Sequence, residues 1–392
     1  MYKQREAWKE AAWVFVMSRV MIVLISFFCF GFFAETARHF APGCKIGAVC
    51  IFYHWDAIHY IHIAAYGYRA MQDTGFFPLW PLILREGGRL LGGYNPLSYL
   101  VASLLVANIC FYFALVFLYQ LVSEEFEQST ARRAVYYFAL SPFSFFFFLG
   151  YTESLFVMLC LAAFLLLRQK GGWAWLCAGL LGFLATFTRS SGLALVVPFV
   201  IVGLRDGLKL RFECVRLAQW WGWLLRLALV LLIPAALGLY MLYLWKIRGD
   251  PLAFSSQEAV VWKRHLSLPW KGMQASLQLL FAPHSNSWTR AQNLLDALFT
   301  VLPLEVLIIG WRRIPLHYAL FALTLAFIAL SFPIYDIEPL TSLPRYLLVA
   351  FPVTIICALW GKHPRFDAFY TAFSLPLFAL ITIMFVVDFW VA

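Results

Sequence analysis

The chain of 392 residues is 63% hydrophobic and only 13% charged, whereas ordinary soluble domains carry roughly 25% charged residues. This composition excludes a soluble globular enzyme, because most of the chain requires a solvent other than water. Lysine and arginine outnumber aspartate and glutamate by 30 to 20. No basic stripe or recognition motif interrupts the apolar stretches, so we expect no nucleic-acid partner. We expect a single integral membrane domain over residues 1–392, in contact with membrane lipids.

Apolar stretches of the length that membrane helices require recur along the chain. A spanning helix needs about 20 mostly apolar residues, because its backbone groups must be satisfied within the segment. We therefore predict an all-α polytopic bundle of about eleven transmembrane helices. Some are short, and Pro142 and Pro198 are expected to kink or break two of them. The predicted spans are 12–34, 97–121, 134–149, 153–168, 173–188, 191–204, 219–245, 293–311, 315–333, 344–360 and 367–391.

Basic residues in the short loops predict the orientation of the bundle. With the N-terminus in the cytoplasm, fifteen lysines and arginines fall in short inner loops, and only Arg189 and Arg345 fall in short outer loops. This asymmetry is the one that the positive-inside rule requires. We therefore expect the two long loops, residues 35–96 and 246–292, on the non-cytoplasmic side.

The first long loop contains a polar segment with helical periodicity. Asp56, His59 and Tyr60 are spaced three and four residues apart, which places them on one side of a helix. The segment is too short and too polar to cross a membrane, so we predict an interfacial amphipathic helix that Gly67 ends. A second interfacial segment is predicted over residues 82–91.

Further polar residues are expected at the same outer face. Glu153 lies at the start of one predicted span, and Arg189 lies between two others. Asp336 and Arg345 precede the tenth. A carboxylate in the first loop and cations near the mouths of later helices would then meet at one membrane surface. Such an arrangement suits chemistry on a lipid headgroup.

Motifs in both halves of the chain resemble those of one enzyme family. Those of the first loop are Trp55-Asp56-Ala57-x-His59-Tyr60, Ala64-x-x-Gly67-Tyr68 and Phe76-Phe77-Pro78-x-x-Pro81. The later ones are Tyr151-x-Glu153-Ser154-Leu155-Phe156, Thr188-Arg189-Ser190-Ser191-Gly192-Leu193 and Pro344-Arg345-Tyr346. In this order they resemble GPI mannosyltransferase 2, the PIG-V family of polyprenyl-phosphate-dependent glycosyltransferases.

The resemblance implies a fold of the GT-C type, a membrane bundle with its active site on the non-cytoplasmic face. It also implies a polyprenyl phosphate sugar as the donor and a lipid-linked or glycan acceptor. Eukaryotic members transfer mannose from dolichyl phosphate mannose to a glycosylated phosphatidylinositol. We expect a prokaryotic relative that acts on another acceptor in the cell membrane; a eukaryotic one would lie in the endoplasmic reticulum membrane.

Transfer from such a donor requires one base and several cations. Phosphate is a good leaving group, so it needs cations to receive its charge more than it needs a proton donor. The acceptor hydroxyl is a poor nucleophile, so one positioned carboxylate suffices for direct displacement with inversion, whereas a glycosidase normally uses two. We interpret Asp56 as this general base. The alternative is that Asp56 caps its helix or pairs with an arginine.

The other charged residues each have more than one interpretation. Arg189 and Arg345 are candidates for binding the donor phosphate, since a guanidinium offers two parallel hydrogen bonds; the alternative is that both anchor helix ends. His59 is a candidate to donate to the phosphate or to steady Asp56, and the alternative is a structural imidazole. Glu153 either holds acceptor hydroxyls, orients Arg189, or stabilises the start of its helix.

Aromatic and acidic residues complete the predicted substrate site. Trp55 and Tyr60 are interpreted as stacking on sugar faces, with anchoring at the membrane interface as the alternative. Asp336 is assigned to substrate binding. The other interpretation is a metal site formed by Asp56, His59 and His62, which recur every three residues, with Asp336 and Glu338 as oxygen ligands. We expect neither a metal nor a cofactor, because arginines can meet the charge of the leaving group.

Two other functions remain open from the sequence. A lipid or sugar transporter without transferase chemistry would favour paired repeats and a site near the bilayer midplane, whereas the polar residues here gather at one face. An inert scaffold would leave the acidic first loop unexplained. Arg19 within the first span requires a partner that the sequence does not identify. Cys44 and Cys50 in the first loop form either a disulfide or free thiols.

Overall fold

A computed structural model describes residues 2–32, 47–93, 95–169, 171–212, 217–282, 286–335 and 338–391. Over these ranges the regular structure is helical, apart from an isolated antiparallel bridge between Arg264 and Ile334. The structure therefore confirms the all-α class that the composition predicted.

Helices of two lengths form the bundle. Six apolar helical segments in the described ranges are long enough to cross a membrane: Gln4–Phe32, Pro96–Glu125, Ser190–Leu208, Gln219–Arg248, Ser287–Arg313 and Pro364–Val386. Four apolar helices are shorter: Glu153–Leu167, Gly172–Thr188, Leu316–Leu330 and Phe351–Trp360. These segments identify an integral membrane protein, but the predicted number of about eleven spans is not confirmed.

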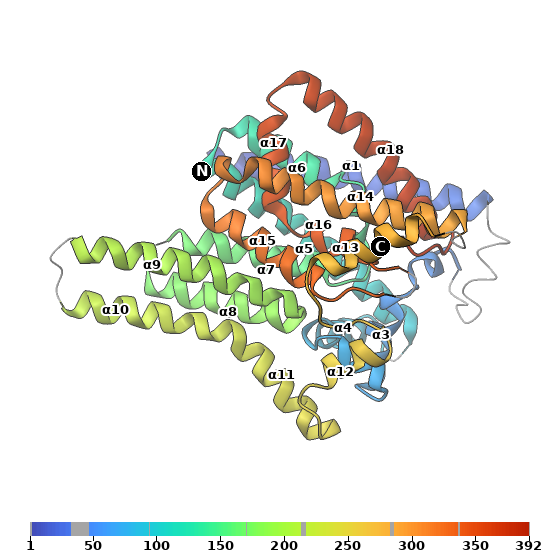
Figure 1. Cartoon of the computed structure of the whole chain (residues 1–392), viewed down its shortest axis with the longest axis horizontal. Coiled ribbons are helices and arrows are strands. Elements are labelled where there is room, and N and C mark those ends of the chain that lie inside the picture. The colour runs from blue at the N-terminus through green and yellow to red at the C-terminus, as the bar shows by residue number, and fades with distance from the viewer. Residues whose placement is uncertain are drawn as a thin grey trace.

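The helices that build these segments are, in chain order, α1 (Tyr2–Phe32), α5 (Pro96–Glu125), α7 (Glu153–Leu167), α8 (Gly172–Thr188), α9 (Val196–Phe212), α10 (Leu217–Ala228), α11 (Leu232–Arg248), α14 (Ser287–Gly310), α15 (Leu316–Leu330), α17 (Phe351–Trp360) and α18 (Pro364–Val386). Figure 1 shows α9 and α10 extending side by side away from the rest of the bundle.

Proline interrupts the predicted span over residues 134–149. Helix α6 (Gln128–Ala139) ends before Pro142, and a short 3-10 helix, η3 (Ser144–Phe147), follows. The break is one of the two outcomes expected for Pro142, and residues 134–149 do not form a single span. Proline disfavours the helical conformation in the residue before it and cannot donate a backbone hydrogen bond, so the helix stops.

The predicted span over residues 344–360 is also divided. It consists of α16 (Leu343–Leu348) and α17, and Pro352 lies in the first turn of the second helix. Pro198, by contrast, lies in the first turn of α9 and leaves that helix continuous. Proline is tolerated there because the amide hydrogens of a first turn have no partner within the helix.

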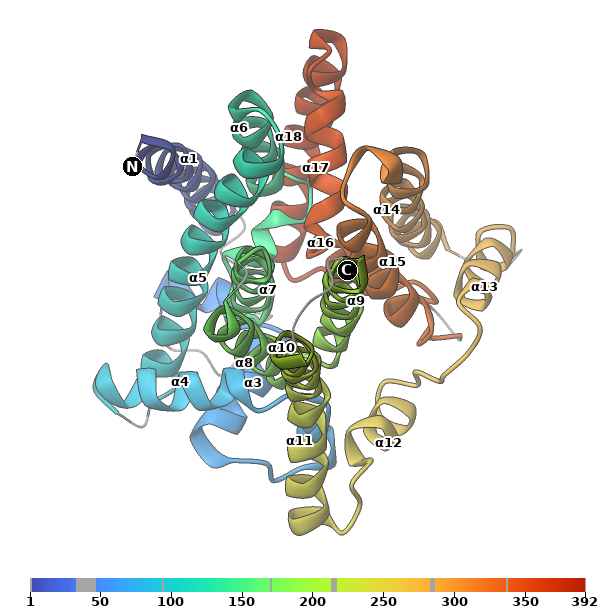
Figure 2. The ribbon, with the colours of Figure 1, turned by 90° about the vertical axis from the view of Figure 1, so that its left-hand side faces the viewer.

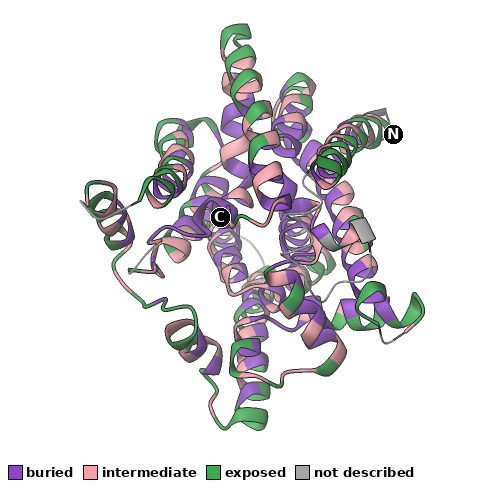
Figure 3. Cartoon of the chain, turned by 90° about the vertical axis from the view of Figure 1, so that its right-hand side faces the viewer, coloured by how far each residue is buried: buried purple, intermediate pink, exposed green. Residues whose placement is uncertain are grey.

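Helices α5, α7 and α8 form the centre of the bundle. Helix α5 packs against α1 and α7, and α8 packs between α7 and α11, as the end-on view in Figure 2 shows. Buried residues gather where helices face each other, and exposed residues lie on the outer faces (Figure 3). Large apolar side chains remain exposed there, such as Phe27 at 67% and Ile308 at 70%. This pattern is expected where lipid replaces water.

The first long loop folds into two short helices, as predicted. Helix α3 (Asp56–Tyr66) ends at Gly67, whose φ of 77° is a conformation that glycine adopts readily. Helix α4 (Leu79–Leu90) covers the second predicted segment and packs against α3 and α5. The question of a Cys44–Cys50 disulfide lies outside the described residues.

The second long loop, between α11 and α14, contains α12 (Ala253–Val260) and α13 (Trp270–Leu280). Helix α12 packs against the 3-10 helix η2 (Met71–Gly75), which lies between α3 and α4 in the first long loop. The extended segment after α12 reaches the chain beyond α15 through the bridge between Arg264 and Ile334. Both long loops therefore meet at the same end of the bundle.

Candidate active site

One cavity of about 470 Å³ lies where the two long loops meet the bundle. Among the predicted site residues, those in its wall are Trp55, Asp56, His59, Tyr60, Arg189 and Arg345. Glu153 lies behind the wall in contact with both arginines. Asp336, assigned to substrate binding from the sequence, lies outside the described residues.

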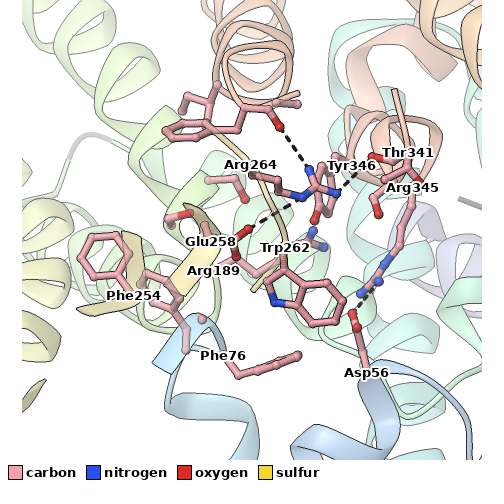
Figure 4. A pocket seen from close by; sticks show the side chains of 18 of the residues that line it. Asp56, Phe76, Arg189, Phe254, Glu258, Trp262, Arg264, Thr341, Arg345 and Tyr346 are labelled. Atoms are coloured by element: carbon pink, nitrogen blue, oxygen red, sulfur yellow. Dashed lines mark hydrogen bonds and ion pairs between the residues drawn. The ribbon is translucent and has the colours of Figure 1, made fainter. Parts of the chain in front are cut away.

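Arg345 connects the two predicted carboxylates. Its Nη1 donates to Oδ2 of Asp56 at 2.6 Å, and its Nε donates to Oε1 of Glu153 at 2.5 Å. The guanidinium lies 4.5 Å from the ring centroid of Tyr151 and is only 3% exposed. Figure 4 shows the Asp56 carboxylate directed at this guanidinium. The arginine pairing that the sequence left as an alternative for Asp56 is therefore present, within the cavity wall itself.

Glu153 is the shared partner of two arginines. Nη1 of Arg189 donates to the same Oε1 at 2.7 Å. Glu153 is fully buried at the first residue of α7, where the helix dipole favours a carboxylate. No hydrogen-bond donor within the described ranges contacts its Oε2 atom. Glu153 is thus placed to orient Arg189 and Arg345, and it lies too deep to touch a ligand in the cavity.

Local backbone geometry places Arg189 at the cavity. The residue ends α8 in an extended conformation and precedes the 3-10 helix η4 (Ser190–Leu195). The amide of Gly192 donates to the Arg189 carbonyl at 2.9 Å. A Cβ atom on Gly192 would lie 2.4 Å from the backbone nitrogen of Thr186. Only glycine therefore permits this turn to pack against the end of α8.

His59 lies among aromatic rings in the cavity wall. Its ring stacks on Phe76 with centroids 4.9 Å apart, and the edge of Trp262 lies 6.1 Å away. Burial lowers the pKa of His59, and the nearby Asp56 carboxylate opposes this effect. A neutral imidazole keeps one N–H group as a hydrogen-bond donor. Tyr60 packs edge-on against the same Phe76 ring at 4.9 Å and is largely buried.

Trp55 precedes Asp56 with an unusual backbone conformation. Its φ of 52° and ψ of −124° are unfavourable for a residue with a side chain. The indole is 38% exposed and packs edge-on against Trp390, with centroids 5.1 Å apart. Such local strain is often found at functional sites, where the surrounding structure holds it in place.

The sequence interpretation missed the residues that reach the cavity from later segments. Arg264 is held on three sides: it donates to the carbonyls of Phe332 at 3.3 Å and Thr341 at 3.2 Å, and its Nε lies 3.7 Å from Glu258. The only sequence signal was the gathering of charged and aromatic side chains in a predicted outer loop. The missed residues in the cavity wall include Glu258, Trp262, Arg264 and Trp390, whereas Glu338 and Tyr346, which the sequence placed at the outer face, also line it.

Two arginines flank one aromatic ring at the cavity. The guanidinium of Arg189 lies 5.0 Å from the ring centroid of Tyr346, and that of Arg264 lies 5.6 Å from it. Both distances lie within the range of cation–π attraction. Arg264 already contacts two carbonyls and a carboxylate, so Arg189 has fewer polar contacts with the protein than Arg264 has.

The fold and the cavity define a class of protein: a helical integral membrane protein with a charged, aromatic-lined site built by its two long loops. Residues 14–205, just under half of the chain, match the model of the mannosyltransferase (PIG-V) family. This match confirms the resemblance seen in the motifs. It contains Asp56, Glu153 and Arg189, whereas Arg345 lies beyond it.

Curated relatives show the same similarity over a limited length. Human GPI alpha-1,6-mannosyltransferase 2 is 38% identical over 149 residues, which is 36% of this chain and 30% of the human protein. The Cricetulus griseus protein of that name is 37% identical over 150 residues, covering 36% and 29%. GPI mannosyltransferase 2 of Schizosaccharomyces pombe is 29% identical over 148 residues, covering 36% and 29%. The similarity therefore spans less than a third of each of these relatives.

Solved structures with a similar arrangement include the Archaeoglobus fulgidus oligosaccharyltransferase tethered to an acceptor peptide. The TM-score is 0.45 at 11% identity, and the match covers 95% of this chain and 55% of the other. The same enzyme in complex with an inhibitory peptide and a dolichol-phosphate gives a TM-score of 0.39 at 12% identity, covering 95% and 55%.

Proposed function

We propose that this protein transfers a mannosyl group from a polyprenyl phosphate mannose to a hydroxyl of a lipid-linked or glycan acceptor. The family of residues 14–205 supports mannosyl transfer. The observation that carries the proposal is that Asp56, Arg189 and Arg345 line one cavity in a membrane protein. A base and two phosphate-binding cations are the groups that this reaction requires.

Asp56 is the general base of the proposed reaction. Arg345 holds its Oδ2 atom, so we assign Oδ1 to the incoming hydroxyl. As the acceptor oxygen attacks the anomeric carbon, its proton passes to Asp56. The bond from that carbon to the phosphate oxygen breaks, and its electron pair leaves with the polyprenyl phosphate. One displacement of this kind inverts the anomeric configuration.

The arginines receive the charge that develops on the leaving phosphate. Arg189 uses one nitrogen for Glu153, and its side chain is 13% exposed toward the cavity. Its remaining N–H groups are available to phosphate oxygens. The neutral His59 imidazole supplies a further hydrogen-bond donor, and Trp55 and Tyr60 provide aromatic surfaces for sugar rings in the cavity. We propose that no metal or cofactor takes part, because these cations already match the charge of the leaving group.

We place the reaction on the non-cytoplasmic side of the membrane. Both long loops contribute to the cavity, through Asp56 from the first and Trp262 from the second. The positive-inside rule assigns these loops to that side. The donor and the acceptor would therefore both be presented from the outer leaflet.

The experiment supplies the purified protein in lipid nanodiscs with labelled mannosyl polyprenyl phosphate and a membrane lipid extract as the source of acceptors. We expect a mannosylated lipid, with the opposite anomeric configuration to the donor, in the presence of EDTA. Asp56→Asn should lower turnover by about 100-fold or more, the usual contribution of a general base. Glu86→Gln on α4, whose side chain is 66% exposed, is the control. Equal turnover by the Asp56 variant would refute the base, and a strict need for divalent metal would refute metal-free transfer.

A further inference from the structure

The last described residues turn back onto the cavity. The sequence predicted a span to residue 391, but α18 ends at Val386 and the chain reverses at Asp388, whose φ is 68°. The amide of Phe389 then donates to the Met384 carbonyl at 2.9 Å. This reversal places Trp390 in the cavity wall.

Three polar contacts hold this segment in place. Asp388 lies 3.1 Å from Nδ1 of His54, two residues before Asp56. The indole nitrogen of Trp390 donates to Oγ1 of Thr341 at 3.0 Å, and Gln292 donates to the Trp390 carbonyl at 3.2 Å. The contacts come from three separate parts of the fold. Trp390 is therefore fixed in one orientation, with both its ring nitrogen and its backbone bound.

The indoles of Trp390 and Trp55 form an aromatic corner beside the proposed base. Their ring planes meet at 62° with centroids 5.1 Å apart. Neither ring is buried in the core: Trp55 is 38% exposed, and both side chains line the cavity. The indole nitrogen of Trp390 is already bound to Thr341, so the surface it presents to the cavity is apolar carbon.

The chemistry of this corner fits a sugar ring. A pyranose has a face rich in C–H groups that packs on an aromatic surface, while its hydroxyl groups require hydrogen-bond acceptors at the edge. Asp56 follows Trp55 in the chain, and the carboxylate of Glu338 also lines the cavity. An aromatic face next to carboxylates therefore matches a ring that carries the reacting hydroxyl.

We propose that Trp390 and Trp55 together form the stacking surface for the acceptor sugar, which makes Trp390 a specificity-determining residue. This inference rests on the proposed transferase function, because Asp56 must contact the acceptor hydroxyl. The donor is held chiefly through its phosphate at Arg189 and Arg345. Loss of the Trp390 ring should therefore weaken acceptor binding and leave donor binding largely unchanged.

The test compares Trp390→Ala, Trp390→Phe and Phe389→Ala with the parent protein in nanodiscs, with octyl α-mannopyranoside as the acceptor probe. Phe389 is a matched control, since it is the adjacent aromatic residue, 45% exposed, and packs on Trp288. We expect Trp390→Ala to raise the KM for octyl mannoside about tenfold, equal to about 1.4 kcal/mol. The donor KM should change by less than about twofold, well below that difference. Trp390→Phe should have a smaller effect and Phe389→Ala none.

A binding measurement separates this inference from the proposed function. Saturation-transfer NMR with octyl mannoside needs no donor and no turnover, and we expect Trp390→Ala to weaken the signal. Binding without product in the parent protein would refute the transferase proposal and leave the sugar surface supported. An unchanged acceptor KM in Trp390→Ala, or an equal rise of both KM values, would overturn the inference. If the alanine variant fails to fold, the phenylalanine variant gives the same readouts.

Discussion

The guanidinium of Arg345 and the carboxylate of Glu153 form a buried ion pair between residues 192 positions apart in the chain. Neither side chain is more than 3% exposed, and Arg189 shares the same carboxylate oxygen. A buried carboxylate that joins two arginines removes most of their mutual repulsion. It also leaves the remaining N–H groups of Arg189 directed at the cavity.

We predict that Glu153→Gln destabilises the protein and reduces transfer together. The neutral amide leaves two arginines close together, and breaking a buried ion pair typically costs about 3–5 kcal/mol. Thermal unfolding in detergent should show a lower midpoint. Turnover should also fall by more than the weaker binding of the donor accounts for. Glu127→Gln, on a side chain 69% exposed and paired with Lys362, should match the parent protein. A stable, fully active Glu153→Gln would contradict the assigned role.

We predict that Arg19→Met weakens the turn that leads into α7. Arg19 donates to Asn108 at 2.8 Å and to the Phe147 carbonyl at 3.0 Å, and Ser154 donates to the same carbonyl at 2.8 Å. Loss of these charge-assisted bonds should lower the free energy of unfolding by about 2 kcal/mol.

These contacts supply the partner that the sequence required for the charge of Arg19. Thermal unfolding of Arg19→Met beside Arg5→Met, an exposed cation on the same helix, measures the effect. The same unfolding midpoint in both variants would show that the hydrogen bonds of Arg19 contribute nothing to the stability of this turn.

We predict that Gly192→Ala is far more damaging than Gly238→Ala. At Gly192 a Cβ atom would lie 2.4 Å from the Thr186 backbone nitrogen, and at Gly238 nothing lies within 4 Å. Relief of the clash must move the turn that carries Arg189, so donor KM should rise and the unfolding midpoint should fall. Gly238 lies within α11, where alanine favours the helix by up to about 1 kcal/mol. Similar donor KM values for the two variants would argue against the rigid turn.

We predict that donor binding weakens as the pH rises through the pKa of Glu258. Burial raises this pKa, Arg264 opposes the shift, and Asp56 adds to it. Below the raised pKa the carboxyl group is neutral, and above it a negative charge faces the leaving phosphate. Glu258 also contributes to folding stability in the same direction. This contribution is present at low pH and is lost as the pH rises through the raised pKa.

The donor KM should accordingly increase with pH in the parent protein. Glu258→Gln, which cannot ionise, should flatten this part of the profile. Profiles that coincide for the two proteins would exclude Glu258 as the titrating group.

The sequence predicted local features of the site better than its long-range contacts. Helical spacing and a glycine stop located α3 and placed Asp56 and His59 in one wall of the cavity. The same reasoning did not find Trp390 or Arg264, because periodicity reports which face of a helix is polar and not which distant segments meet it. The break at Pro142 was anticipated only as one of two outcomes, since a proline can either kink or end a helix.

The division of the ion-pair cluster along the chain has a consequence for how homologues are compared. The family match ends at residue 205, so it includes both carboxylates that Arg345 neutralises but not Arg345 itself. The matched segment therefore contains two acidic residues and only one of the two arginines of the cluster, Arg189. A comparison with homologues that is confined to the matched segment would omit the arginine that contacts both carboxylates, so it would describe this cluster with an excess of negative charge.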